Sequence, residues 1–256
     1  MTDESIQDIF KKNNKIEVPS EGKPEEPKLE THKEGGELGK TPHKRFAALL
    51  IDLGLNLLIV FGLVFVIQSF IASPFRVSGP SMCNTLNYID EECVQGYGDY
   101  VIVNKIGYLI GEPQRGDIVV FRPPHAEDQF YIKRIIGVPG DTVKIINGKV
   151  YIYNDEYPTG YELEEQEYLN EDNYGKTQLG NNREDTFEVP DGKYFVLGDN
   201  RHNSTDARNC FRDVYEGACR GAEDYFLEKH YIEGKAWLML WPIQHIGFLA
   251  DPAYAE

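Results

Sequence analysis

The chain has little positive charge. Its 256 residues include 26 Lys and Arg against 42 Asp and Glu, which gives a net charge of −16 at pH 7. Proteins that bind DNA or RNA draw most of their affinity from Lys and Arg that neutralise phosphates. The composition therefore argues against a nucleic-acid partner. The length suits one sizeable domain with an additional short segment, or two small domains.

Cysteine is also scarce, and its spacing argues against a zinc site. The four cysteines form none of the CxxC pairs that are typical of zinc ligands. Of the three possible connectivities, we favour two local pairs, because each closes a short loop and would contribute roughly 2–3 kcal/mol to stability. Such disulfides require an oxidising compartment, and four free thiols are the alternative. The favoured pairs are Cys83 with Cys93 and Cys210 with Cys219.

Only one long apolar run occurs in the sequence. Residues 46–72 are predominantly apolar, which is enough to cross a hydrocarbon layer of about 30 Å. A cleavable signal peptide is the alternative, but the polar leader before the run is too long for one. We predict an uncleaved transmembrane anchor over residues 44–73. Lys44 and Arg45 precede the run and only Arg76 follows closely, so the positive-inside bias places the N-terminus in the cytoplasm.

The segments on either side of the anchor differ in composition. Residues 1–43 are rich in Lys, Glu, Pro and Gly and nearly free of aromatics, which predicts a disordered cytoplasmic tail. Residues 74–256 carry short β-branched and aromatic runs bounded by Gly and Pro, which predict a mostly β ectodomain with antiparallel strands. The predicted strands include 100–103, 117–121 and 193–197, and a hairpin at 143–153 that turns at Asn147-Gly148.

Two stretches of this ectodomain are predicted insertions. Residues 154–185 are acidic and tyrosine-rich, without clear periodicity, which indicates an inserted subdomain or loop. Residues 209–233, which contain the second cysteine pair, form the other predicted insertion.

A serine in an accessible turn is the first candidate for chemistry. Ser81 follows Gly79 and Pro80 and precedes Met82, shortly after the apolar run. Gly79 lets the backbone approach a substrate, Pro80 stiffens the turn, and the Ser81 amide can point at a developing oxyanion. Because Gly-Pro-Ser is also a common surface turn, this motif alone does not predict a nucleophile.

A lysine in apolar surroundings is the second candidate. The motif YIKRIIGVPGD covers residues 131–141. On a strand, Lys133 and Arg134 point to opposite faces that both carry isoleucine, so at least one charge lies among apolar side chains. Burial can lower a lysine pKa by up to about 3–5 units, and a neutral lysine beside a serine can accept its proton. A lysine that reaches solvent from an edge strand is the alternative.

The third candidate motif, GDNRHNSTDAR, covers residues 198–208. Its many Asp, Asn, Arg and Ser residues suit a hydrogen-bonded loop that holds other groups in place.

Together the motifs resemble those of the type I signal peptidases, or leader peptidases. The family's boxes appear in order after a membrane anchor, at residues 81–82, 115–121, 131–141 and 198–208. The resemblance covers roughly residues 44–243. It implies an all-β, barrel-like fold on the outer face of the membrane, and a Ser-Lys dyad that removes signal peptides from exported preproteins.

The resemblance also implies roles for individual residues. Ser81 is the nucleophile, and Lys133 is the general base and then the general acid. Ser204 matches the serine that hydrogen-bonds the lysine, and Gly79 lies at the position that supports the oxyanion. Two structural ion pairs are implied, Arg134 with Asp199 and Asp206 with Arg208.

The residues that match the family's substrate pockets are mostly apolar. Such pockets exclude large side chains and would favour Ala at the −1 and −3 positions of the substrate. The implied pocket residues are Phe75, Val77, Met82, Leu86, Tyr131 and Ile132.

The partners and location follow from the same resemblance. We expect signal peptides of secreted preproteins, the lipid bilayer and the protein-export machinery as partners, with no cofactor, metal or nucleic acid. The expected location is the plasma membrane, as a single-pass protein with its catalytic domain on the outer face.

Asn84 stands where the family usually has proline, and this change and the large insertions keep an alternative without catalysis open; a further protease class is weighed beside it. A bridge from Cys83 to Cys93 would supply the rigidity that proline gives. The first alternative is a catalytically silent ectodomain that binds exported chains. The second is a self-cleaving repressor-type Ser-Lys protease, which would need a DNA-binding head where this chain has a membrane span.

The cysteine pairing predicts the thiol count of the denatured protein. If both pairs are bridged, thiols are absent without reductant and all four cysteines react after reduction. Titration of the denatured chain with a thiol reagent, with and without reductant, measures this. An equal count under both conditions would refute the disulfides.

Overall fold

The computed structural model describes residues 42–89, 92–212 and 219–254. The predicted disordered tail, residues 1–43, lies outside these ranges except for its last two residues. These two begin the helix α1 (Pro42–Val66), which continues into a π-helical turn at Ile67–Ile71.

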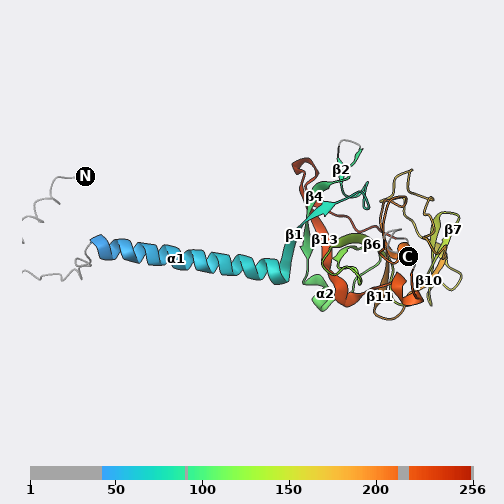
Figure 1. The fold of residues 1–256 in the computed structure, drawn as a ribbon, viewed down its shortest axis with the longest axis horizontal. Helices are drawn as coiled ribbons and strands as arrows, with labels where there is room; N and C mark the ends of the chain where they lie inside the picture. The colour runs from blue at the N-terminus through green and yellow to red at the C-terminus, as the bar shows by residue number, and fades with distance from the viewer. Residues whose placement is uncertain (1–41, 90–91, 213–218, 255–256) are drawn as a thin grey trace, which may run out of the picture. The chain divides into compact units, whose positions relative to one another are not determined.

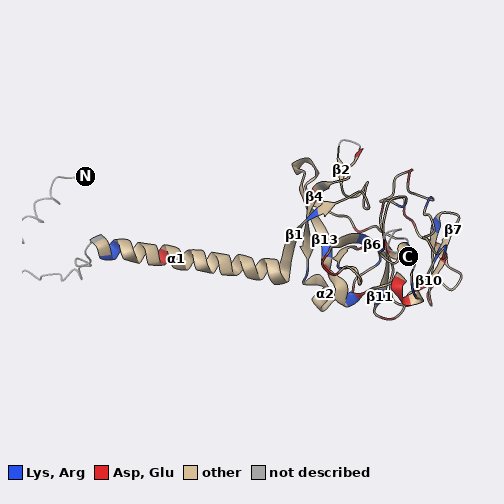
Figure 2. Ribbon diagram, in the orientation of Figure 1, with Lys and Arg blue, Asp and Glu red and all other residues tan. Residues whose placement is uncertain are grey.

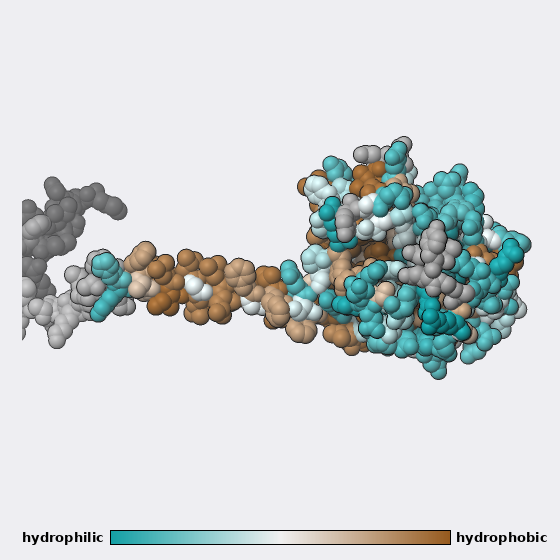
Figure 3. Space-filling model, viewed as in Figure 1, coloured by the Kyte–Doolittle hydropathy of each residue, from teal (hydrophilic) through white to brown (hydrophobic). Residues whose placement is uncertain are grey.

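The helix α1 is formed by the one long apolar run. Residues 43–71 are long and apolar enough to cross a membrane. The side chains along α1 are hydrophobic in Figure 3, and charges appear in Figure 2 only near its beginning and at one further position. A helix that is apolar all round suits a lipid environment, and this supports the predicted anchor. The first strand begins at Ala72, so the last two residues of the predicted anchor, 72–73, belong to the sheet.

The main body is an eight-stranded sheet in which every pair is antiparallel, and it confirms the prediction of a mostly β ectodomain (Figure 1). The strand order is β1-β4-β13-β5-β6-β11-β12, with β14 paired to β13. These strands are β1 (Ala72–Ser78), β4 (Tyr97–Asn104), β5 (Ile118–Phe121), β6 (Tyr131–Gly137), β11 (Lys193–Leu197), β12 (Leu227–Glu228), β13 (Ile232–Trp241) and β14 (Gly247–Phe248).

A four-stranded sheet, in the order β10-β7-β8-β9, lies at the end of the body opposite β1 and β4 (Figure 1). The predicted hairpin is confirmed, because β7 and β8 turn at Asn147 and Gly148, which both have positive φ. A short ribbon of β2 and β3 follows the serine turn. The bounds are β2 (Tyr88–Ile89), β3 (Glu92–Cys93), β7 (Thr142–Ile146), β8 (Lys149–Tyr153), β9 (Tyr161–Glu162) and β10 (Thr186–Glu188).

Two hydrophobic cores hold the strands. The larger core joins both sheets, and it includes Phe121, Phe187 and Phe195. The smaller core lies under β1, β4 and β13, and it includes Val77 and Val101. All four residues of β5 are buried because side chains pack against both of its faces. This central position fixes its neighbour β6, which carries Lys133.

The predicted insertion at residues 154–185 contains one short strand, β9, and otherwise turns. Leu163 and Leu169 anchor it, since both are buried. Within the second predicted insertion, 209–233, residues 213–218 lie outside the described ranges. The remainder includes β12 and two 3-10 turns, Ala222–Tyr225 and Lys229–Tyr231.

Candidate functional site

Ser81 lies in the turn that follows β1. Gly79 has φ +81°, a conformation that favours glycine. Two asparagines hold the carbonyl groups of the turn. Asn87 Nδ2 donates to Gly79 O (2.9 Å), while the side-chain and main-chain N–H groups of Asn200 donate to Pro80 O and Ser81 O (both 3.1 Å). The turn that carries Ser81 is therefore fixed from two directions.

Lys133 approaches Ser81 from β6. Its Nζ lies 2.8 Å from Ser81 Oγ and 2.8 Å from the main-chain oxygen of Ile132. Only 4% of Lys133 is exposed, and Arg134 is buried as well. Both basic side chains of the second motif are therefore enclosed, whereas the alternation along the strand required this of only one.

Burial lowers the pKa of Lys133 to about 8. Asp206 and Asp199 act in the opposite direction, but each is already bound to an arginine. Arg134 donates to both oxygens of Asp199 (2.7 and 3.0 Å), and Arg208 donates to both oxygens of Asp206 (2.8 and 2.9 Å). Burial also works to raise the pKa of Asp206, yet Arg208 holds it below its ordinary value. The arginines thus keep these carboxylates from becoming full counter-ions of the lysine.

Ser204 Oγ is buried near Asp206 and has no hydrogen-bond partner among the described residues. The resemblance implied a hydrogen bond from Ser204 to Lys133, but the Nζ donates instead to Ser81 and to a main-chain oxygen. The low pKa of Asp206 is due mainly to Arg208, and the nearby Ser204 hydroxyl adds to this effect. Gly198 makes this packing possible, because a Cβ there would lie 2.2 Å from Ser204 Oγ and 2.4 Å from Ser81 O.

A pocket of about 300 Å³ opens beside Ser81 and Lys133. Its apolar walls include four of the residues implied by the resemblance, together with Phe130, whose ring packs edge-on against Phe75 with centroids 5.0 Å apart. Met82 and Leu86, the other two implied residues, are buried in the smaller core, which also contains Val77 of the pocket wall. The implied residues that do line the pocket are Phe75, Val77, Tyr131 and Ile132.

Asn87 is a site residue that sequence reasoning missed. Its side-chain oxygen accepts from Asp99 N (2.8 Å), and its own N–H donates to Asp99 Oδ2 (2.6 Å). Burial raises the pKa of Asp99, and the hydrogen bond from Asn87 partly offsets this. Asn87 has φ 58°, which asparagine tolerates better than most residues. Nothing in the local sequence around Asn87 signals this role.

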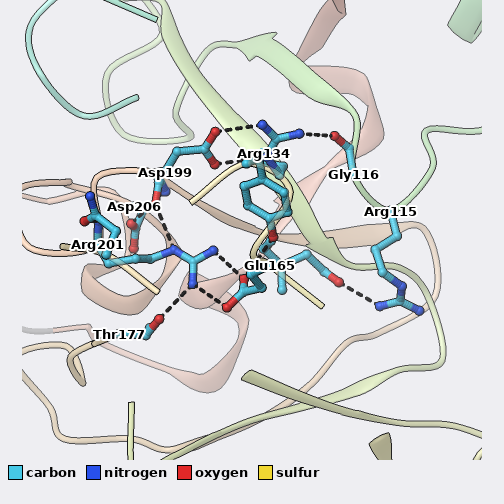
Figure 4. A network of polar contacts seen from close by, with 12 residues as sticks. Arg115, Gly116, Arg134, Glu165, Thr177, Asp199, Arg201 and Asp206 are labelled. Atoms are coloured by element: carbon cyan, nitrogen blue, oxygen red, sulfur yellow. Dashed lines mark hydrogen bonds and ion pairs between the residues drawn. The ribbon is translucent and has the colours of Figure 1, made fainter. Parts of the chain in front are cut away.

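A second buried network adjoins the site (Figure 4). Arg201, from the third motif, donates to Glu165 Oε2 (2.9 Å) and to Thr177 Oγ1 (2.7 Å). Glu165 and Thr177 both belong to the predicted insertion, and both the guanidinium and the carboxylate are buried. Burial works to lower the pKa of Arg201, but Glu165 holds it above its ordinary value. Sequence reasoning missed this pair.

Both cysteine pairs favoured from the sequence are bridged in this structure. The Cα atoms are 5.6 Å apart for Cys83 and Cys93, and 5.7 Å apart for Cys210 and Cys219. The first disulfide begins two residues after Ser81 and closes the loop that carries Asn87.

Comparisons with known proteins point to one family. The family model described as signal peptidase, peptidase S26, matches residues 50–241. The chain is 32% identical over 212 residues to a probable signal peptidase I-2 of Synechocystis sp., covering 80% of each protein. It is 33% identical over 189 residues to a signal peptidase I of Pseudomonas aeruginosa, covering 62% of this chain and 63% of the relative.

A solved structure of a signal peptidase I from Enterococcus faecalis also matches, with 31% identity. The match covers 49% of this chain and 97% of the other. Its TM-score of 0.33 is too low to add to the description of the fold.

The lowered pKa of Lys133 predicts the pH dependence of peptide cleavage. Below a pKa of about 8 the lysine is protonated and cannot accept the Ser81 proton. The value of kcat/KM, which reports the free enzyme, should therefore fall about tenfold per pH unit on the acid side and level off above the pKa. Initial rates at low substrate concentration across the pH range measure this. An acid limb centred more than about two units lower would show that another group is the base.

Proposed function

The chain belongs to the signal peptidase family, peptidase S26, and we propose that it removes signal peptides from exported preproteins through a dyad of Ser81 and Lys133. The observation that carries the proposal is the 2.8 Å separation of Lys133 Nζ and Ser81 Oγ in a buried site. An amine whose pKa is lowered to about 8 is an effective base near neutral pH.

In the proposed reaction, Lys133 takes the hydroxyl proton of Ser81 as Oγ attacks the carbonyl carbon of the scissile bond. The main-chain N–H of Ser81, two residues after Gly79, donates to the oxyanion that develops. The ammonium of Lys133 then returns its proton to the amine of the departing mature chain, which leaves an ester on Ser81. In the second half, Lys133 deprotonates the water that hydrolyses this ester, and Ser81 regains its proton.

The pocket supports a preference for small residues at the −1 and −3 positions. Its walls are apolar, and the contact between Phe75 and Phe130 narrows one side. A pocket of this kind discriminates by excluding larger side chains. Cleavage after an A-x-A sequence follows from that exclusion.

We place the enzyme in the plasma membrane as a single-pass protein, with its N-terminus in the cytoplasm and its catalytic domain on the outer face. The apolar helix α1 and the basic residues Lys44 and Arg45 before it support this orientation. The two disulfides suit an oxidising exterior. The lipid bilayer and the protein-export machinery are then its partners, together with signal peptides.

Cleavage of a purified preprotein with an A-x-A site tests the proposal. The detergent-solubilised full chain is compared with Ser81→Ala and Lys133→Ala, and the N-termini of the products are sequenced. We expect the wild type to cut after the −1 alanine and both variants to be at least about 10³-fold slower. Lys149→Ala is the matched control, because this lysine pairs with Glu162 outside the site, and its rate should be unchanged.

A wild-type protein that binds preproteins but does not cleave them would contradict the proposal and favour a catalytically silent ectodomain.

A further inference from the structure

We propose that Glu165, in the insertion between β8 and β10, is a positioning residue for the catalytic centre. Its ion pair with Arg201 holds the loop of residues 198–208, which in turn holds the turn of Ser81. The inference rests on the proposed function and gives the insertion at 154–185 a role in catalysis.

The ion pair between Glu165 and Arg201 is fully enclosed. Both residues are 1% exposed, and Arg201 uses both terminal nitrogens of its guanidinium to reach the carboxylate. Thr177 Oγ1 accepts a further hydrogen bond from Arg201 (2.7 Å), and so does Gly198 O (3.1 Å). A buried guanidinium with this many partners has one defined position.

A second residue of the insertion reaches both halves of the site. The side-chain oxygen of Asn173 accepts from Arg201 N (2.7 Å), and its amide nitrogen donates to Asn84 Oδ1 (3.1 Å). Asn84 belongs to the loop that follows Ser81, and Arg201 belongs to the third motif. The insertion therefore bridges the two segments that meet at the nucleophile.

The loop held by Arg201 contacts the main chain of the Ser81 turn directly. Asn200, the preceding residue, donates to the carbonyls of Pro80 and Ser81. The carbonyl of Arg201 accepts from Arg208 Nη1 (3.0 Å), and Arg208 is the partner of Asp206 near Lys133. A shift of Arg201 would therefore move the Ser81 turn and the charges around the lysine together.

Loss of the Glu165 charge would leave Arg201 buried without its carboxylate. Asp199 is close enough to help raise the pKa of Arg201. Asp199 is already bound to Arg134 and accepts from Thr85 Oγ1, so competition for it would disturb the arrangement around Lys133. The expected effect is a loss of alignment at Ser81, which lowers kcat and changes KM much less.

The test compares Glu165→Gln with Glu162→Gln in the detergent-solubilised full chain. Glu162 is the matched control, because it lies in the same insertion and pairs with Lys149 at the surface of the four-stranded sheet. With a peptide that carries an A-x-A site, we expect Glu165→Gln to lose about 10- to 100-fold in kcat with KM changed less than about threefold. Glu162→Gln should match the wild type in both. Thermal unfolding confirms that the measured variants are folded.

A folded Glu165→Gln with the kcat of the wild type, or one with a change in KM alone, would overturn the positioning role. If Glu165→Gln does not fold, Asn173→Ala serves in its place and is expected to lower kcat in the same way; a wild-type kcat for that variant would also overturn the inference. The wild-type control separates the two claims: an inert wild type contradicts the proposed function itself.

Discussion

The burial of Lys133 without a counter-ion of its own is the constraint on which the site depends. An amine that is 4% exposed has its pKa lowered by loss of water. Two carboxylates, Asp199 and Asp206, oppose that effect, but Arg134 and Arg208 bind them. The two ion pairs thus have an electrostatic effect in addition to their structural one, because they leave the lysine able to accept a proton from Ser81.

The polar contacts around this lysine join segments that are distant in the chain. The Ser81 turn, β6, the insertion and the loop of residues 198–208 are linked through buried arginines and asparagines. Buried ion pairs often add little to stability compared with apolar residues of similar size, but removal of one partner is costly. Their value here lies in geometry: they fix the 2.8 Å approach of Nζ to Oγ.

Local patterns in the sequence were enough to predict several strands and the presence of an enclosed charge. The hairpin at Asn147-Gly148 follows from its turn residues, and the apolar residues on both faces of β6 require that at least one of Lys133 and Arg134 is enclosed. The resemblance to the signal peptidases supplied Ser81 as the partner of that lysine. Neither step required long-range information.

Contacts between distant segments could not be read in this way. Met82 follows Ser81 in sequence, but its side chain is buried in the smaller core, together with Val77 and Val101 of the pocket wall. Glu165 lies 36 residues from Arg201, in a segment without periodicity, so no local pattern predicts the pair.

The most direct test of the central claim, that a neutral Lys133 is the base, is cleavage by Lys133→Arg from about pH 6 to about pH 10. Arginine keeps the charge but cannot lose its proton in this range, so the account predicts a folded enzyme without activity at any pH. Cleavage above about a tenth of the wild-type rate would contradict a neutral lysine as the base.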